Sequence, residues 1–403
     1  MAMVNMQDLL QHAYENRYAV GAFEIVSLDF LQAVIEAAEC ARSPVILNIV
    51  ETHSVMFDVE SLMAAVICSA RRTSVPVCVQ LDHCASTEAI KNGIRLGCNS
   101  VMFDGSHECF TDNVQHSKEV AELAHGCGVA IEGEIGIVAG MLNPDTQDEN
   151  RSNKLTSVNE AKAYVERTDV DFLAIAVGNE HGKTATRVKL DFNRLARINA
   201  AVQKPLVIHG GSGLSDDQYH KLIDHGVAKI NYFTALAERA CSQVKSNLKQ
   251  KDSDYHEIFG QVRQRISEET QRCMQVWGSA GRAAEVFVQC RPWRNVEHVI
   301  PFDSSEKDQL ALENLLASIQ QQLLDTPGVM DVQLGQSVIL DGQIHYFWLI
   351  RLSNEKVLGN YLPKAMKTVF ENHQGTLGYK NSIGGDYKMH EARTTLRSGT
   401  RMN

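Results

Sequence analysis

Three histidines stand at or shortly after the ends of apolar runs that are typical of buried strands. The stretch VPVCVQLDHCAS (residues 75–86) ends its apolar run on Asp82 and His83, and His181 and His209 follow two later runs. If these runs are parallel strands, their carboxyl ends meet at one face of the fold, and we expect the three imidazoles to converge there. Three neutral imidazoles with one open position are typical of a catalytic zinc site. The sequence therefore predicts a metal centre with a carboxylate beside it.

Further polar side chains fall at the ends of other apolar runs. Histidines in helical or loop stretches, such as His107 and His125, are interpreted as structural. The additional polar candidates at the same face are Asp104, Ser106, Glu132, Glu134, Asn231 and Thr234.

Two turns beside these histidines are suited to binding a phosphate. VIHGGSG (residues 207–213) ends one apolar run and precedes a helical stretch, and KINYFT (residues 229–234) lies where the last run gives way to a helix. Backbone N–H groups and the positive end of a helix dipole converge in such turns. We therefore expect a phosphate site beside the metal centre.

The elements that position these residues are eight short apolar runs, each followed by an amphipathic stretch with helical spacing. Strands that alternate with helices indicate a parallel sheet covered by helices. Eight units in about 250 residues favour a closed (β/α)8 TIM barrel in the α/β class over an open sheet. The runs begin at Tyr18, Pro44, Pro76, Ser100, Val129, Phe172, Pro205 and Val227.

The chain divides into three parts by pattern. We assign residues 1–288 to the barrel, 289–374 to a small α+β unit with the order strand, helix, strand, strand, helix, and 375–403 to a polar C-terminal tail. A stretch without periodicity, residues 137–157, follows the fifth run, and a long loop of this kind is usually functional or disordered. We expect it to lie over the mouth of the barrel.

Composition excludes several classes of function. The 403 residues carry a net charge of −10, which argues against binding to nucleic acid or to an anionic membrane. No apolar run is long enough to span a membrane, and the N-terminus does not resemble a signal peptide. Ten scattered cysteines without a C-x-x-C pair indicate reduced thiols. We therefore expect a cytoplasmic protein.

Six motifs together resemble the class II, metal-dependent ketose-bisphosphate aldolases. LDHC, SVMFDGSH, EGEIG, NEHG, IHGGSGL and KINYFT occur in the order and spacing of that family, over residues 3–284. The resemblance implies a zinc-bearing barrel that cleaves a ketose phosphate to dihydroxyacetone phosphate and an aldehyde. A monovalent cation, sodium or potassium, is a further candidate cofactor.

The resemblance also implies roles for individual residues. His83, His181 and His209 would bind zinc, with Glu134 as a carboxylate near the metal, and Asp82 would be the catalytic acid/base. The remaining residues assigned to substrate binding are Gly182, Gly210, Gly211, Ser212, Asn231, Tyr232, Phe233, Thr234, Glu24, Asp104, Ser106 and Arg263.

The sequence departs from the family near the distal end of the substrate. Glu24, in GAFEI, stands where the family has asparagine, and Asn48 and Val50 replace a glutamine and a serine. A carboxylate and an apolar group there disfavour a second phosphate, because they repel its charge and offer it no donor. We therefore expect a ketose 1-phosphate without a distal phosphate, with fructose- or tagatose-1,6-bisphosphate as the alternative.

Two further assignments depend on the family pattern. The loop that carries an acidic pair in family members reads VAGMLNPD here, which leaves Asp145, Asp148 and Glu149 as candidates for moving the proton on C3. Arg263 matches an arginine that reaches a neighbouring subunit's substrate in family members.

The C-terminal unit resembles the stress-responsive A/B barrel (Dabb) domains, which are ferredoxin-like and pair into dimers. The similarity depends on His298, the turn at residues 326–329 and the spacing of the elements. It implies a homodimer or homotetramer in which the unit either fixes the assembly or shields the mouth of the barrel.

Two other functions are alternatives to the aldolase hypothesis. A zinc hydrolase of the amidohydrolase type would carry H-x-H after the first strand, where GAFEIVS has no histidine. A non-catalytic sugar-phosphate sensor would not need Asp82 beside three histidines. Both are therefore less favoured.

Overall fold

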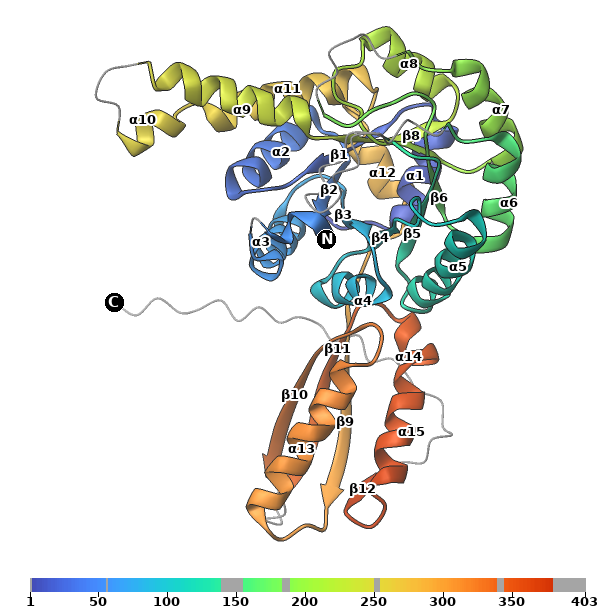
Figure 1. Cartoon of the computed structure of the whole chain (residues 1–403). Helices are drawn as coiled ribbons and strands as arrows, with labels where there is room; N and C mark the ends of the chain where they lie inside the picture. The colour runs from blue at the N-terminus through green and yellow to red at the C-terminus, as the bar shows by residue number, and fades with distance from the viewer. Residues whose placement is uncertain are drawn as a thin grey trace.

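The computed structural model describes residues 2–55, 57–138, 155–182, 189–249, 254–338 and 344–379. The first part of the chain forms a closed barrel of eight parallel strands in sequence order (Figure 1). The (β/α)8 fold expected from the sequence is confirmed. The strands are β1 (Val20–Glu24), β2 (Val45–Val50), β3 (Val77–Cys84), β4 (Ser100–Phe103), β5 (Ala130–Ile135), β6 (Phe172–Ile175), β7 (Leu206–Ile208) and β8 (Val227–Tyr232).

Helices cover the outside of the barrel. Several begin at a serine or aspartate whose side chain accepts a backbone N–H of the first turn, as Ser27 and Ser215 do. The helices are α1 (Met6–Glu15), α2 (Leu28–Ala41), α3 (Val59–Arg72), α4 (Thr87–Leu96), α5 (Phe110–Gly126), α6 (Val158–Thr168), α7 (Phe192–Val202), α8 (Asp216–Asp224), α9 (Thr234–Asn247), α10 (Tyr255–Phe259), α11 (Val262–Val276) and α12 (Ala283–Gln289), with the short 3-10 helix η1 (Glu51–Val55) after β2. Figure 1 shows α9, α10 and α11 extending from the barrel as an arm.

The barrel interior changes from apolar to polar along the strands. At the amino end, side chains such as Val20, Ile46 and Cys78 pack with α1 and α12 in a separate apolar cluster. Side chains two or four residues further along the same strands include Glu24, Asn48, Gln80 and Asp82. Since residues two apart on a strand share a face, these polar groups also point inward, at the carboxyl end. Apolar side chains therefore fill the amino end of the barrel, and polar side chains that can take part in chemistry line the carboxyl end.

The C-terminal unit is a four-stranded antiparallel sheet with helices. The strand order is β10-β11-β9-β12, and the connectivity β-α-β-β-α-β is that of a ferredoxin-like fold. Its last strand lies in the segment that the sequence analysis assigned to a polar tail. The elements are β9 (Val296–Ser304), α13 (Gln309–Leu324), β10 (Val329–Val338), β11 (Ile344–Leu352), α14 (Lys356–Asn360), α15 (Leu362–Asn372) and β12 (Leu377–Tyr379).

This unit docks on turns at the amino end of the barrel strands. Asn360 Nδ2 donates to the Gly126 carbonyl oxygen at 3.0 Å, and Ser353 Oγ donates to the Cys127 carbonyl oxygen at 3.3 Å, both in the turn between α5 and β5. Figure 1 shows the unit below α4 and α5. The alternative that the unit shields the mouth of its own barrel is therefore wrong, because the mouth lies at the opposite ends of the strands.

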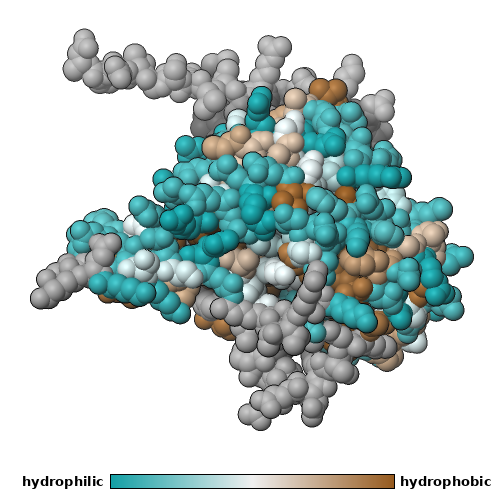
Figure 2. All heavy atoms as spheres, turned by 90° about the horizontal axis from the view of Figure 1, so that it is seen from above, coloured by the Kyte–Doolittle hydropathy of each residue, from teal (hydrophilic) through white to brown (hydrophobic). Residues whose placement is uncertain are grey.

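The surface of the molecule is mostly hydrophilic on the face that Figure 2 shows. Figure 2 shows a face on which hydrophilic side chains predominate and apolar ones form small areas between them. Among the described helices, none is both long and apolar enough to cross a membrane.

Trp277 holds the arm to the barrel, and its replacement tests this packing. Its ring is 1% exposed, stacks on Phe23 at 5.7 Å between centroids, and meets Tyr219 and Tyr232 edge-on at 5.4 Å each. We expect Trp277→Ala to lower the free energy of unfolding by about 3–5 kcal/mol, because it leaves a large cavity. Urea unfolding followed by circular dichroism measures this change.

The matched control is Val288→Ala on α12, where the side chain is 84% exposed. It should change stability by no more than about 0.5 kcal/mol. Equal effects of the two substitutions would contradict the packing described.

Candidate active site

The three histidines predicted as metal ligands meet at the mouth of the barrel. One ring nitrogen of each of His83, His181 and His209 lies within 4.8 Å of the other two. The ring centroids are 4.7 Å apart for His83 and His209, and 5.9 and 6.0 Å from His181. Asn179 donates to the His209 carbonyl oxygen at 2.9 Å and thereby ties the turn that carries His181 to β7. The sequence prediction that these residues converge is confirmed by this geometry.

The backbone at His83 explains how two neighbouring residues serve one site. Successive side chains of a regular strand point to opposite faces, so Asp82 and His83 would normally diverge. His83 instead has a φ of 51°, and the pairing of β3 with β4 shifts register between Leu81 and Cys84. A non-glycine residue in this left-handed region is strained, and such strain is typical of functional sites.

Asp104 and Ser106 lie behind His83. The His83 Nδ1 atom is 2.9 Å from Asp104 Oδ2, and Ser106 Oγ donates to Asp104 Oδ1 at 2.6 Å. A carboxylate on Nδ1 directs the other ring nitrogen, Nε2, toward the centre of the site. Burial opposes protonation of the ring, but the Asp82 charge and the Asp104 hydrogen bond raise the pKa of His83 to about 10. Asp104 and Ser106 were predicted to bind substrate, but in the structure they orient His83.

Asp82 is fully buried and is held by three amides. Asn48 Nδ2 and Asn231 Nδ2 each donate to Asp82 Oδ2 at 2.8 Å, and Gln80 Nε2 donates to Oδ1 at 3.0 Å. Burial alone would raise the pKa of this carboxyl. The Lys229 charge, followed by the nearby imidazoles and the Asn48 hydrogen bond, holds it below the usual value instead. Asp82 is therefore an ionised, fixed hydrogen-bond acceptor beside the histidines.

A buried ion pair beneath the histidines was missed by the sequence analysis. Lys229 Nζ is 2.7 Å from Glu132 Oε2, and Glu132 Oε1 is 2.9 Å from His209 Nε2. All three side chains are 0% exposed. The pair sets the direction of the His209 ring, which presents Nδ1 to the other histidines, 3.0 Å from His83 Nε2. The available signal was the lysine inside the apolar run VAKINYF.

The Glu134 carboxyl lies beside the three histidines and provides a further acceptor oxygen. Its Oε2 atom is buried, has no hydrogen-bond partner among the described residues, and lies 3.9 Å from His209 Nδ1. Burial, reinforced by the Asp104 charge, raises the pKa of this carboxyl well above its usual value. Burial and the two other imidazoles lower the pKa of His181 to about 3, so that this ring is neutral.

These donors fit a divalent metal ion. Three imidazoles form the candidate ligand set, and the orphaned Glu134 oxygen lies beside them. Among the described residues, the Asp82, Asp104 and Glu132 carboxylates outnumber the Lys229 ammonium and the His83 ring with its raised pKa, so the site keeps an excess of negative charge that a cation would compensate.

The glycine turn after β7 and the start of α9 lie together beside the histidines. Gly210 has a φ of 63°, and a side chain there would clash with the Glu180 carbonyl oxygen. Gly211 N donates to the Asn231 carbonyl oxygen at 3.1 Å, and Ser212 Oγ accepts from Ala235 N at 3.2 Å. These contacts join the two turns expected to bind phosphate. Gly182, next to His181, has a φ of 81° and open space where a side chain would be.

The other predicted substrate residues are distributed differently. The Tyr232 side chain turns away from the mouth, packs on Trp277 and donates to Glu269 at 2.8 Å, so its assignment as a substrate-binding side chain is wrong. Phe233 and Glu24 lie at the rim, where both contact His53. Arg263 reaches Gln32 and Glu36 on α2 and does not contact the mouth of its own barrel. Asp145, Asp148 and Glu149 lie outside the described residues.

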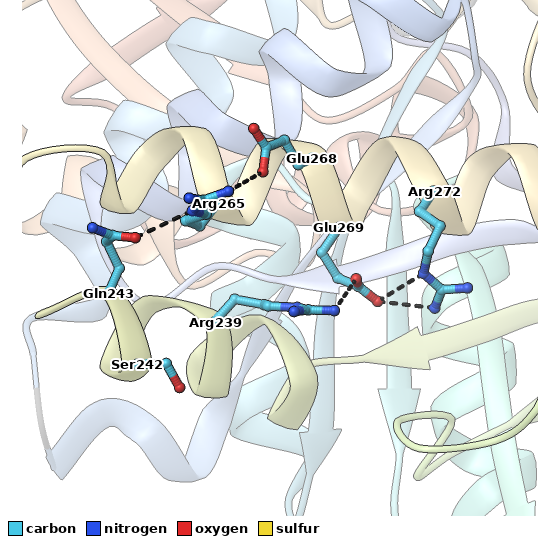
Figure 3. A pocket seen from close by; sticks show the side chains of 7 residues that line it. All are labelled: Arg239, Ser242, Gln243, Arg265, Glu268, Glu269 and Arg272. Atoms are coloured by element: carbon cyan, nitrogen blue, oxygen red, sulfur yellow. Dashed lines mark hydrogen bonds and ion pairs between the residues drawn. The ribbon is translucent and has the colours of Figure 1, made fainter. Parts of the chain in front are cut away.

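A groove of about 380 Å³ lies away from the histidines, between α9 and α11 (Figure 3). Its arginines are already paired: Glu269 accepts from Arg239 and from Arg272, and Arg265 pairs with Glu268. Through Glu269, which also accepts from Tyr232, the groove residues fasten α11 to the end of β8. The residues that line this groove therefore have a structural role outside the barrel.

The mouth of the barrel thus combines a three-histidine cluster, a fixed carboxylate and a glycine turn at a helix start. A family model described as fructose-bisphosphate aldolase class-II matches residues 4–282. The chain belongs to the class II fructose-bisphosphate aldolase family. It is an aldolase, a lyase that acts on a carbon–carbon bond, and the resemblance seen in the motifs is confirmed.

Relatives of this aldolase differ in the substrate that their names state. A fructose-bisphosphate aldolase from Thermus caldophilus is 36% identical over 306 residues, covering 70% of this chain and 100% of the relative. A sulfofructosephosphate aldolase from Alkalicoccus urumqiensis is 34% identical over 285 residues, covering 70% and 99%. The crystal structure of the YdjI aldolase from Escherichia coli K12 is 32% identical, with a TM-score of 0.63 and coverage of 70% and 99%.

Replacement of Lys229 tests the buried ion pair of this aldolase. Lys229→Met leaves the Glu132 carboxylate buried without its ammonium partner, and we expect a loss of about 3–5 kcal/mol in the free energy of unfolding. The double variant Lys229→Met/Glu132→Gln should recover most of this loss. Urea unfolding of both variants gives the two values.

Lys162→Met is the matched control, because Lys162 is 57% exposed and pairs with Glu166 on the surface of α6. It should cost no more than about 1 kcal/mol. A comparable loss in both single variants would show that burial does not set the strength of the Lys229 pair.

Proposed function

We propose that this aldolase is zinc-dependent and reversibly cleaves a ketose 1-phosphate to dihydroxyacetone phosphate and an aldehyde. The observation that carries the proposal is the convergence of His83, His181 and His209 next to the fixed Asp82 carboxylate. Fructose- or tagatose-1,6-bisphosphate is the alternative substrate. A non-catalytic sugar-phosphate sensor is less favoured, since binding alone would not need Asp82.

The metal would be held by the three imidazoles, with the Glu134 carboxyl beside them. A zinc ion bound there would act as a Lewis acid and stabilise negative charge on the substrate oxygens. The protein's part is to fix the ligands: Asp104 orients His83, and Glu132 orients His209. Sodium or potassium remains a candidate second cofactor.

Asp82 would carry the proton of the C4 hydroxyl. Cleavage between C3 and C4 requires the C4 hydroxyl to lose its proton as the aldehyde forms, and condensation requires the reverse. An ionised carboxylate held by Asn48, Asn231 and Gln80 is suited to this transfer, because it accepts the proton at a fixed position. Because the three amide donors are already in place around Asp82, they need little reorientation when the carboxylate gains or loses the proton.

The phosphate of dihydroxyacetone phosphate would bind between the turn after β7 and the start of α9. Gly210, Gly211 and Ser212 come from the turn, and Thr234 begins the helix. Phe233, the residue before α9, makes no side-chain cap, and Ser212 Oγ accepts from Ala235 N in the first turn, so an anion bound here would meet both the positive end of the helix and this hydroxyl. Asn231 and Gly182 would complete this end of the substrate site.

The distal end of the substrate would lie toward Glu24 and Val50. Val50 on β2 pairs in register with Asp82 on β3, and Glu24 on β1 pairs in register with Asn48 on β2. Going around the mouth from Asp82, Val50 therefore lies on the next strand and Glu24 on the strand after that. Neither offers a donor to a phosphate, and Glu24 would repel one. This supports a ketose 1-phosphate whose distal end is not phosphorylated.

We also propose that the enzyme is a cytoplasmic homodimer or homotetramer. The ten cysteines are all free thiols in the structure. The ferredoxin-like unit supports the proposed Dabb-like pairing, and Arg263, on the flank of the barrel, would be directed at a neighbouring subunit.

Two substitutions separate metal binding from proton transfer. His181→Ala should lose both zinc and activity, because two imidazoles rarely hold a catalytic zinc. Asp82→Asn should retain zinc but lower kcat by about 10²–10⁴-fold, because it removes the acid/base. Zinc content by mass spectrometry and aldol cleavage by a coupled assay measure the two effects. Full turnover after chelation would contradict zinc dependence.

The substrate proposal has its own measurement. We expect kcat/KM for fructose 1-phosphate to exceed that for fructose 1,6-bisphosphate by about tenfold or more, since a few kcal/mol of repulsion at Glu24 suffices. Glu24→Asn should reduce this preference. A wild-type enzyme that prefers the bisphosphate would overturn the substrate while leaving the aldolase assignment intact.

A further inference from the structure

Glu24, His53 and Phe233 form a cluster at the rim of the mouth, which we call the rim cluster. Glu24 ends β1, His53 lies in the short helix η1 after β2, and Phe233 follows β8. The Glu24 Oε1 and His53 Nδ1 atoms are 2.7 Å apart, and the His53 and Phe233 rings are 5.8 Å apart. Three segments far apart in the sequence therefore meet at this point.

The rim cluster lies next to the residues that hold Asp82. Glu24 pairs in register with Asn48, whose amide donates to Asp82 at 2.8 Å. Phe233 follows Asn231, which donates to the same Asp82 oxygen, by two residues. A substrate whose reacting carbons lie at Asp82 would extend past Asn48 to the rim cluster.

The hydrogen-bonding capacity of the cluster is one-sided. The Glu24 Oε1 and His53 Nδ1 atoms lie 2.7 Å apart without the alignment of a hydrogen bond, so among the described residues Glu24 Oε1 remains a buried acceptor without a hydrogen-bond partner. Asn48 Oδ1 is a further buried acceptor that has no hydrogen-bond partner within the described part of the chain. The cluster thus offers acceptors, which suit hydroxyl groups and not a phosphate.

Packing fixes the imidazole in this position. The His53 ring meets the Phe57 ring edge-on at 6.4 Å and is tilted against Phe233. Its side chain is nevertheless 20% exposed, so that part of it remains open to a ligand. Among the described residues, Arg263 is directed to α2, and the His53 ring lies against the Glu24 carboxylate.

We propose that His53 is a specificity-determining residue that positions Glu24, so that the rim cluster accepts hydrogen bonds from hydroxyl groups at the distal end of the substrate and rejects a phosphate there. The inference rests on the proposed function, because it assumes that a ketose 1-phosphate occupies the mouth. It adds His53, which the family motifs do not include, to the residues that select the substrate.

The test uses the condensation reaction of the zinc-loaded, full-length enzyme. Dihydroxyacetone phosphate is combined with glyceraldehyde or with glyceraldehyde 3-phosphate, and KM is measured for each reactant. His53→Ala should raise KM for glyceraldehyde by about tenfold and leave KM for dihydroxyacetone phosphate unchanged. Glu24→Gln, which replaces the charge by an amide donor, should shift kcat/KM toward the phosphorylated aldehyde by about tenfold.

The double variant and a matched control complete the design. In the Glu24→Gln background, His53→Ala should have less than about a third of its effect in the wild type, because the two residues act as a unit. His116→Gln, on the outside of α5, should change neither KM. Additive effects, or equal changes in both KM values, would overturn the inference. If the wild-type enzyme condensed dihydroxyacetone phosphate with neither aldehyde, the proposed function itself would be overturned.

Discussion

The buried ion pair between Lys229 and Glu132 is the interaction on which the active site depends. A barrel whose mouth carries several carboxylates and imidazoles cannot leave those charges uncompensated, because a lone buried charge is very costly. Lys229 lies at 2.7 Å from Glu132, and its charge also stabilises the ionised form of Asp82. Glu132 in turn directs the His209 ring. One lysine thus pairs with Glu132, acts through it on the orientation of the His209 ring, and stabilises the ionised Asp82.

A second constraint is geometrical, and it concerns the neighbours Asp82 and His83. The proposed chemistry needs both side chains on one face, whereas a regular strand separates them. The left-handed backbone at His83 and the register shift of β3 resolve this conflict. Asp104 then holds the ring that the backbone has turned. The strain is local, and the close packing on either side of β3 maintains it.

The sequence predicted the barrel and the convergence of the histidines because both depend on position along a strand, which apolar runs reveal. It could not predict that Tyr232 points outward, since the face of a residue at a strand end depends on the exact register of β8. His53 was missed because the short helix η1 has no periodicity. Lys229 was missed because its partner Glu132 is 97 residues away. The last strand of the C-terminal unit, β12, has only three residues and lies in a stretch without a strand pattern.

His83, His181 and His209 are proposed to bind one metal ion beside Asp82. Anomalous diffraction from zinc-loaded crystals, recorded on both sides of the zinc absorption edge, tests this claim most directly. We expect one strong peak at about 2.0–2.1 Å from a nitrogen of each of the three rings. No peak at this position, or a peak that one of the three rings does not contact, would contradict it.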